Sequence, residues 1–224
     1  MKLTVDNKLQ VKGKVLEGGP SERVHAMMYP IEVRTARNIS HLSDYFTFGF
    51  VRNPWVRLIS CYKDKVVRHI NRIGADINSF AARRRKGEAP LDHALLEDML
   101  LYLINKTDLD TLNTHVRPQS LMLGIPVIQY DYLLPIEHVN EQIAPVLQYL
   151  RNHSEVEEVL VGEGYDKIDD PQKSSSVISA REWLPNIDPE LIEKFYKIYE
   201  SDFKIMNYSN FTDPNFPYPL NYVD

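Results

Sequence analysis

The chain has 224 residues, of which 43% are hydrophobic and 25% charged, as is ordinary for a protein with an apolar core. Its formal net charge of −5 disfavours a nucleic-acid-binding module, which would usually be basic, so no nucleic-acid partner is expected. The lone cysteine, Cys61, allows no intrachain disulfide, and no run of 18 apolar residues predicts a membrane segment. We expect one soluble domain over residues 1–224, cytoplasmic in type, although a domain excised from a lumenal protein would have the same composition.

The N-terminal residues alternate apolar and polar side chains from residue 2 to residue 16. Asp6 and Asn7 lie between two such runs, which predicts a hairpin or two half-buried strands. Gly18-Gly19-Pro20-Ser21 has the composition of a turn or loop, and residues 31–42 fit a short helix. Residues 1–21 are therefore expected to form strands and a loop.

The clearest local pattern spans residues 46–66. The run FTFGFV at 46–51 predicts a buried strand, and apolar side chains then recur at helical spacing from Trp55 to Val66. Asn53 is a good N-cap residue, and Pro54 suits the first position of a helix. A strand should therefore lead directly into a helix, with Arg52 at the junction.

Further helical patterns alternate with one more apolar run. We expect a second buried strand at 126–130 and helices over 92–105, 136–152 and 189–203. The segment 169–176 is a polar loop, and 209–224 is an extended tail. Strands alternating with helices predict an α/β fold of three layers, with a mostly parallel sheet flanked by helices.

Arg52 occupies the place where open α/β sheets bind ligands, beyond the carboxyl end of a strand. The first amides of the following helix favour an anion, and a guanidinium is a planar, permanently charged partner for phosphate oxygens. Ser60 lies off the apolar stripe of that helix. These residues predict a phosphate site made of Arg52, the helix start and Ser60. A structural ion pair of Arg52 is the alternative.

The stretch FVRNPWVRLISCYKDKV resembles the 3′-phosphate-binding motif of the carbohydrate-type (family 2) sulfotransferases, Arg-x-Pro-x-x-Arg-x-x-Ser after a strand. The matching residues are Arg52, Pro54, Arg57 and Ser60. THVRPQSLML, QYDYLLPIEHV and PELIEKFYKIYESDFKIMNY look like later segments of the same family, in the same order. The resemblance covers about residues 22–208. It implies the P-loop-like sulfotransferase fold, with Arg52 and Ser60 binding the 3′-phosphate of 3′-phosphoadenosine 5′-phosphosulfate (PAPS).

The family's second motif, Pro-Lys-Thr-Gly-Gly-Thr-Ser, cradles the 5′-phosphosulfate. Its nearest counterpart is residues 15–21, with matches at Gly18, Gly19 and Ser21. However, Leu16 replaces the lysine, Glu17 adds negative charge, and Pro20 removes an amide donor. Lys14 could supply the lost cation, although it lies on the opposite face of the strand from Val15. This segment is either a degenerate cofactor loop or an unrelated hairpin.

Sulfuryl transfer to a hydroxyl needs a general base, and a histidine is the usual one near neutral pH. Family members often carry a histidine where His25 lies, so we expect His25 to be the base. His115 is the second candidate for the base, but we expect it to line the acceptor side together with Arg117. Lys173 and Ser174 resemble part of a family loop that closes over the nucleotide, or they belong to a solvated loop. We expect the other histidines on the surface: His41, His69, His93, His138 and His153.

The basic run Arg83-Arg84-Arg85-Lys86 could attract a sulfated or acidic glycan, or it is a solvated helix end. No cluster of histidines or carboxylates has the spacing of metal ligands, and the chemistry needs no metal. A P-loop kinase is disfavoured because no Gly-Lys-Ser/Thr loop is present.

The sequence thus predicts a PAPS-dependent sulfotransferase that releases adenosine 3′,5′-bisphosphate. Its acceptor would be a hydroxyl of a carbohydrate or of a glycosylated or other small molecule. The alternative is a non-catalytic relative that binds nucleotide or glycan without turnover, which Leu16 and Glu17 favour. Neither the identity of the acceptor nor the oligomeric state follows from these patterns.

Overall fold

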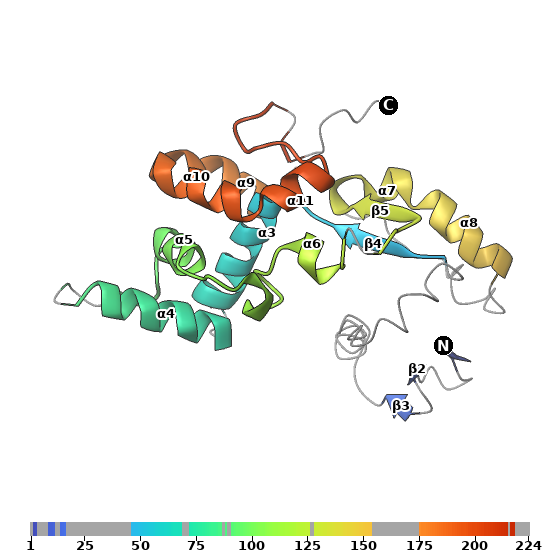
Figure 1. Cartoon of the computed structure of the whole chain (residues 1–224), viewed down its shortest axis with the longest axis horizontal. Coiled ribbons are helices and arrows are strands. Elements are labelled where there is room, and N and C mark those ends of the chain that lie inside the picture. Colours follow the sequence, from blue (N-terminus) through green and yellow to red (C-terminus); the bar gives the residue numbers. More distant parts are fainter. Residues whose placement is uncertain are drawn as a thin grey trace. The chain divides into compact units, whose positions relative to one another are not determined.

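The structure is a computed structural model that describes residues 2–3, 9–11, 14–16, 46–68, 72–86, 88, 91–125, 128–153, 175–214 and 216–217. Two compact units make up the chain, residues 1–45 and residues 46–224 (Figure 1). Most of the described residues belong to the second unit.

In the first unit, the described residues form three short antiparallel strands in the order β1-β2-β3. They are β1 (Lys2–Leu3), β2 (Leu9–Val11) and β3 (Lys14–Leu16). Lys2 pairs with Gln10, and Gln10 in turn pairs with Val15. This is the antiparallel pairing expected of a hairpin. The expected helix at 31–42 lies outside the described residues.

The described part of the second unit contains a small parallel sheet of β4 (Phe48–Val51) and β5 (Tyr132–Pro135). Phe48 lies opposite Tyr132, and Val51 opposite Pro135. The predicted strand at residues 46–51 is confirmed. The prediction of a buried second strand at 126–130 is wrong, because the paired residues are 132–135. Of the predicted segment, residues 126 and 127 lie outside the described residues, and the backbone N–H of Ile128 donates to the carbonyl of Gly124, whose φ is +66°.

The strand β4 is buried on one face only, so its prediction as a fully buried strand was wrong. Val51 is buried, whereas Phe48 is 37% and Phe50 46% exposed. Aromatic rings contact one another around this outer face: Phe46 packs on Phe48, and Phe48 packs edge-on against Phe50. Phe46 also stacks on Tyr149 with 3.8 Å between the ring centroids.

Helices account for most of the described residues of the second unit. The helix predicted after Arg52 is confirmed as α3 (Pro54–Cys61), which continues as a π-helix, η2 (Tyr62–Arg68). The helix predicted at 92–105 is α5 (Leu96–Ile104). The one predicted at 136–152 is divided into η4 (Ile136–His138), α7 (Val139–Gln142) and α8 (Ala144–His153). The one predicted at 189–203 is divided into α10 (Pro189–Ile198) and α11 (Glu200–Ile205).

The remaining helical segments are short or connect these elements. They are α4 (Arg72–Arg84), η3 (Leu109–Thr111), α6 (Gln119–Met122), α9 (Ser175–Trp183) and η6 (Leu184–Asn186). Among the described residues, none of the helices has both the length and the apolar character needed to cross a membrane. The described chain is therefore a helix-rich α/β protein with a small parallel sheet.

The core is centred on α3, which packs against α9 (Figure 1). Trp55 and Ile59 are completely buried. The Trp55 ring lies 4.3 Å from the ring of Phe195 on α10 and 5.4 Å from that of Phe211, measured between centroids. The indole N–H of Trp55 donates to Asn210 Oδ1 over 2.9 Å. The first turn of α3 is thus held from several sides, which fixes the backbone next to Arg52.

Candidate functional site

The junction between β4 and α3 is built around Asn53, which caps the helix as predicted. Its side-chain oxygen accepts a hydrogen bond from the N–H of Trp55 over 3.0 Å. Its side-chain nitrogen donates to the carbonyls of Ser209 and Pro217, each over 3.1 Å. Asn53 is fully buried, and its two bonds to Ser209 and Pro217 tie the C-terminal segment to the start of α3.

Few backbone donors remain free at the start of α3. Pro54 has no N–H, the N–H of Trp55 is bound by the Asn53 side chain, and the N–H of Asn53 donates to Glu137 Oε1. The expectation that the helix amides hold a phosphate therefore loses much of its support. The Arg52 guanidinium is a cation that follows the carboxyl end of β4 directly.

The backbone of Arg52 is bound by a side-chain amide from α6. Its N–H donates to Gln119 Oε1 over 2.9 Å, and its carbonyl accepts from Gln119 Nε2 over 2.7 Å. The guanidinium is partly buried, and this burial lowers its pKa. Within the described ranges, no hydrogen bond or direct ion pair of the guanidinium is found, although the charge of Glu137 acts on it.

Glu137 supplies the negative charge that acts on Arg52. Its carboxylate is 4% exposed and accepts hydrogen bonds from the Asn53 N–H over 3.0 Å and from the Tyr208 hydroxyl over 2.7 Å. Burial raises the pKa of Glu137, while the two hydrogen bonds and the Arg52 charge act in the opposite direction. Burial also raises the pKa of Tyr208, and the Glu137 charge adds to this. The Arg52 guanidinium therefore lies in the field of a buried carboxylate–phenol pair.

Asp202 on α11 holds the segment that contains Gln119. Its two oxygens accept from the backbone N–H groups of Gln119 and Ser120 over 2.7 and 2.8 Å. Asp202 is fully buried and Gln119 is 7% exposed. Sequence reasoning missed Gln119, Glu137 and Asp202. One local signal was available: Pro118 begins α6 without a capping side chain of its own, so the helix needs an acceptor from elsewhere.

Arg57, the second arginine of the motif, contacts the loop before α6. Its Nη1 donates to the carbonyl of Arg117 over 2.6 Å, and its Nη2 donates to the carbonyl of Thr114. Nη2 also lies 3.2 Å from Met122 Sδ. Burial lowers the pKa of Arg57. This arginine therefore serves to attach the loop to α3.

The loop held by Arg57 carries the predicted acceptor residues His115 and Arg117, both partly exposed. The backbone N–H of His115 donates to Asn113 Oδ1, and Arg117 Nε donates to the carbonyl of Leu112. Ser60 is also partly exposed and lies on α3, the helix to which the loop is attached. The His115 loop is thus joined to the segment that begins at Arg52 in two places. Arg57 binds the loop itself, and Gln119, which follows the loop, binds the backbone of Arg52.

Lys63, which follows Ser60 by three residues, is attached to the start of α9. Its Nζ donates to the carbonyl of Ser175 over 3.0 Å and to Ser179 Oγ over 3.2 Å. Ser175 directly follows Lys173 and Ser174, which lie outside the described residues. His25, Gly18, Gly19 and Ser21 also lie outside them, and Lys14 is described only as the first residue of β3.

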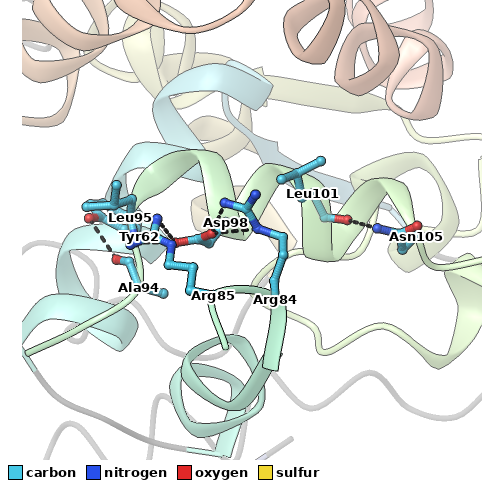
Figure 2. A network of polar contacts seen from close by, with 8 residues as sticks. All are labelled: Tyr62, Arg84, Arg85, Ala94, Leu95, Asp98, Leu101 and Asn105. Atoms are coloured by element: carbon cyan, nitrogen blue, oxygen red, sulfur yellow. Dashed lines mark hydrogen bonds and ion pairs between the residues drawn. The ribbon is translucent and has the colours of Figure 1, made fainter. Parts of the chain in front are cut away.

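The basic run at the end of α4 has a structural partner (Figure 2). Asp98 on α5 is fully buried and accepts from Arg84 Nη2 over 2.6 Å, from Arg85 Nη2, and from the N–H of Leu95 over 2.9 Å. Two of the four basic residues therefore bind α5 rather than forming a free surface. Tyr62 belongs to the same neighbourhood and donates through its hydroxyl to the carbonyl of Ala94.

A pocket of about 300 Å³ lies between the end of α4 and the segment before α5. Its lining includes Arg85 and His93, and it contains none of the residues predicted for the site. His93 is partly exposed, whereas the side chain of His138 is only 15% exposed and its Nε2 is buried, so the prediction that His138 is a surface residue was wrong. In the described part of the chain, no group of histidines, cysteines and carboxylates could hold a metal ion.

The sequence was compared with known proteins. The model of the sulfotransferase family matches residues 20–209. Human carbohydrate sulfotransferase 14 is 30% identical over 116 residues, which is 49% of this chain and 30% of that protein. Mouse carbohydrate sulfotransferase 11 is 29% identical over 188 residues, or 76% of this chain and 49% of that protein. Mouse carbohydrate sulfotransferase 12 is 25% identical over 182 residues, which is 75% of this chain and 41% of that protein.

The chain therefore spans half or less of the length of these relatives. No solved structure matches it significantly. The family match covers most of the chain and includes the Arg52 junction, the His115 loop and the buried acids that support them. This chain belongs to the sulfotransferase family.

Proposed function

We propose that this chain transfers a sulfuryl group from PAPS to a hydroxyl of a carbohydrate. Membership of the sulfotransferase family and the names of its relatives, all carbohydrate sulfotransferases, support this proposal. The observation that carries it is the Arg52 guanidinium at the carboxyl end of β4, with its backbone held on both sides and no side-chain partner among the described residues. A cation held in this way is suited to an external phosphate.

In the proposed reaction, Arg52 and Ser60 hold the 3′-phosphate of the cofactor. The acceptor oxygen forms a bond to sulfur as the bond from sulfur to the 5′-phosphate oxygen breaks, and that oxygen leaves with the electron pair on adenosine 3′,5′-bisphosphate. His25 takes the proton of the acceptor hydroxyl. Positioning and charge stabilisation supply most of the catalysis in the related transfer of phosphoryl groups, and no metal is required here.

The other roles stay predictions of the sequence. Lys14, Gly18, Gly19 and Ser21 would hold the 5′ end of the cofactor, Lys173 and Ser174 would close over it, and His115 and Arg117 would line the acceptor side. We also propose that β4 and β5 belong to a three-layer fold with a mostly parallel sheet, as the resemblance implies. The single-domain organisation and the cytoplasmic location stay predictions as well.

The first test is calorimetric titration with adenosine 3′,5′-bisphosphate, with ATP as the comparison ligand. We expect metal-independent binding of the bisphosphate that Arg52→Ala weakens by about 10- to 100-fold, the cost of losing charge-assisted hydrogen bonds. Arg83→Ala removes an exposed arginine from α4 and should leave the affinity unchanged. Equal affinities of the Arg52→Ala variant and the parent protein would refute the phosphate site.

Turnover separates the proposed enzyme from a protein that only binds the nucleotide. With PAPS and a panel of glycan acceptors, the parent protein should release adenosine 3′,5′-bisphosphate. His25→Ala should lose this turnover while it keeps the affinity for the bisphosphate. Tight binding with no turnover on any acceptor would favour the non-catalytic alternative. Full turnover by His25→Ala would assign the base to another residue.

A further inference from the structure

The side chain of Gln119 forms an unusual contact with Arg52. Its amide oxygen accepts the backbone N–H and its amide nitrogen donates to the backbone carbonyl of the same residue, over 2.9 and 2.7 Å. A neighbouring strand would satisfy these groups within a sheet, but Arg52 lies one residue beyond β4. The amide of Gln119 therefore takes the place of a strand at the point where the chain leaves the sheet.

This contact fixes the backbone dihedral angles of Arg52. The N–H and the C=O of Arg52, which lie on either side of its φ and ψ bonds, are bound by one planar amide, and Gln119 is 7% exposed, so water competes little for these bonds. The direction in which a side chain leaves the backbone follows from those dihedrals. The Gln119 contact thus fixes the point and direction from which the Arg52 side chain starts, and among the described residues no hydrogen bond or ion pair binds its guanidinium.

Gln119 is itself held in place. Asp202 binds its backbone N–H and that of Ser120, and the Gln119 Nε2 lies 3.8 Å from Met206 Sδ. From the other direction, Arg57 binds the carbonyl of Arg117, two residues before Gln119. The segments 52–57 and 117–119 are therefore joined twice, once by a side chain from each.

We infer that Gln119 is a positioning residue, which orients Arg52 for the 3′-phosphate, and that Asp202 acts through Gln119. This inference rests on the proposed function, since it holds that the Gln119 contact prepares Arg52 to bind the 3′-phosphate of that cofactor. A purely structural role would instead make Gln119 important for stability and equally important for every ligand.

The test is a double-mutant cycle between Gln119→Met and Arg52→Ala in the full chain. Methionine has a similar length and no amide, so the hydrogen bonds are lost with little change in volume. We expect Gln119→Met to weaken the binding of adenosine 3′,5′-bisphosphate by about five- to tenfold. Adenosine 5′-monophosphate, which lacks the 3′-phosphate and is measured by competition, should bind with unchanged affinity. In the Arg52→Ala background, Gln119→Met should change the bisphosphate affinity by less than about twofold.

Gln148→Met is the matched control, because Gln148 is exposed on α8. It should change neither affinity. If Gln119→Met weakens both nucleotides equally, or if its effect adds fully to that of Arg52→Ala, the residue does not act through Arg52 and the inference is overturned. If Arg52→Ala itself has no effect, the proposed phosphate site has failed first, and the positioning role fails with it.

A second variant covers the case in which Gln119→Met does not fold. Asp202→Asn removes one of the two acceptors that hold Gln119 and Ser120, and leaves the amide of Gln119 in place. It should produce the same pattern in weaker form: a selective loss of bisphosphate affinity that disappears when Arg52 is alanine. A loss of equal size for both nucleotides would overturn the inference by this route too.

Discussion

At the scale of single residues, the relation between Arg52 and Glu137 decides how strongly the site can hold an anion. In the free protein, the buried carboxylate offsets part of the cost of desolvating the guanidinium, whose pKa burial lowers. In a complex, the same negative charge repels the phosphate that Arg52 is expected to bind. Burial raises the pKa of Glu137, while two donors, the N–H of Asn53 and the hydroxyl of Tyr208, favour its charged form.

We therefore predict that Glu137→Gln tightens the binding of adenosine 3′,5′-bisphosphate, by about two- to fivefold, because it removes a negative charge near Arg52. The same change should lower the free energy of unfolding by about 1–2 kcal/mol, since a neutral amide cannot accept from both donors as well as a carboxylate does. Calorimetric titration gives the first quantity and urea unfolding gives the second.

Asp98→Asn provides the comparison, because Asp98 is an equally buried acid that binds Arg84 and Arg85 instead. It should lower stability without changing the affinity for the nucleotide. Weaker binding by Glu137→Gln would contradict the prediction. It would mean that Glu137 serves mainly to keep Arg52 in place.

At the scale of elements, α4 and α5 are joined by one acid and two arginines (Figure 2). Asp98 also accepts from the N–H of Leu95, so it caps its own helix and binds the neighbouring one. The side chain of Arg85 is 13% exposed and that of Arg84 is 43% exposed. The two ion pairs should therefore contribute very different amounts to the stability of the protein.

We predict an order of destabilisation, with Asp98→Ala first, Arg85→Ala second and Arg84→Ala last. The first leaves a buried arginine without its partner and should cost about 3–5 kcal/mol, while the last should cost less than about 1 kcal/mol. Arg83→Ala, in the same run but with no ion pair to Asp98, serves as the control. Equal losses for all three arginines would show that the run acts through its charge alone.

The elements that local chemistry specifies were the ones that could be predicted. The start of α3 follows from Asn53, Pro54 and the apolar stripe that begins at Trp55, all within a few residues of one another. The position of β5 does not, because a parallel strand is defined by its pairing with β4, which lies 84 residues away. The apolar run before it was therefore mistaken for the strand.

In the candidate site, too, the residues that nearby sequence specifies could be predicted, and those that depend on distant contacts could not. Arg52 could be identified from the residues next to it. Gln119 and Glu137 could not, because their bonds to residues 52 and 53 cross 67 and 84 residues of sequence. A polar residue gives no sign in the sequence that it will be buried, nor which backbone group it will bind. Arg57 matched a motif, but its contacts with the His115 loop depend equally on distant residues.

At the scale of the whole molecule, the overall charge and the charge of the site have opposite signs. The chain carries a net charge of −5, yet its predicted ligand is strongly anionic. Far from the protein the ligand is repelled, and only the field close to Arg52 attracts it. The two contributions respond differently to salt, because screening acts over about 8–10 Å at ordinary ionic strength.

We predict that the affinity for adenosine 3′,5′-bisphosphate falls by about threefold or more between about 0.05 and 0.5 M NaCl, because the local attraction dominates. In Arg52→Ala the dependence should flatten or reverse, since only the general repulsion is left to be screened. The measurement is a series of titrations of both proteins at fixed pH. An affinity that rises with salt in the parent protein would show that no cationic site governs binding.

The burial of Trp55 beside this site has an optical consequence. The chain contains two tryptophans, and the other, Trp183, lies near Lys63 and Tyr62. Trp55 follows Arg52 by three residues and is enclosed by aromatic rings. Its indole N–H donates to Asn210. A Trp183→Phe variant would leave a single emitter at the phosphate end of the proposed site. We predict that binding of the nucleotide at Arg52 changes the emission of Trp55 in this variant, which a fluorescence titration would measure; unchanged emission at saturating nucleotide would contradict the prediction.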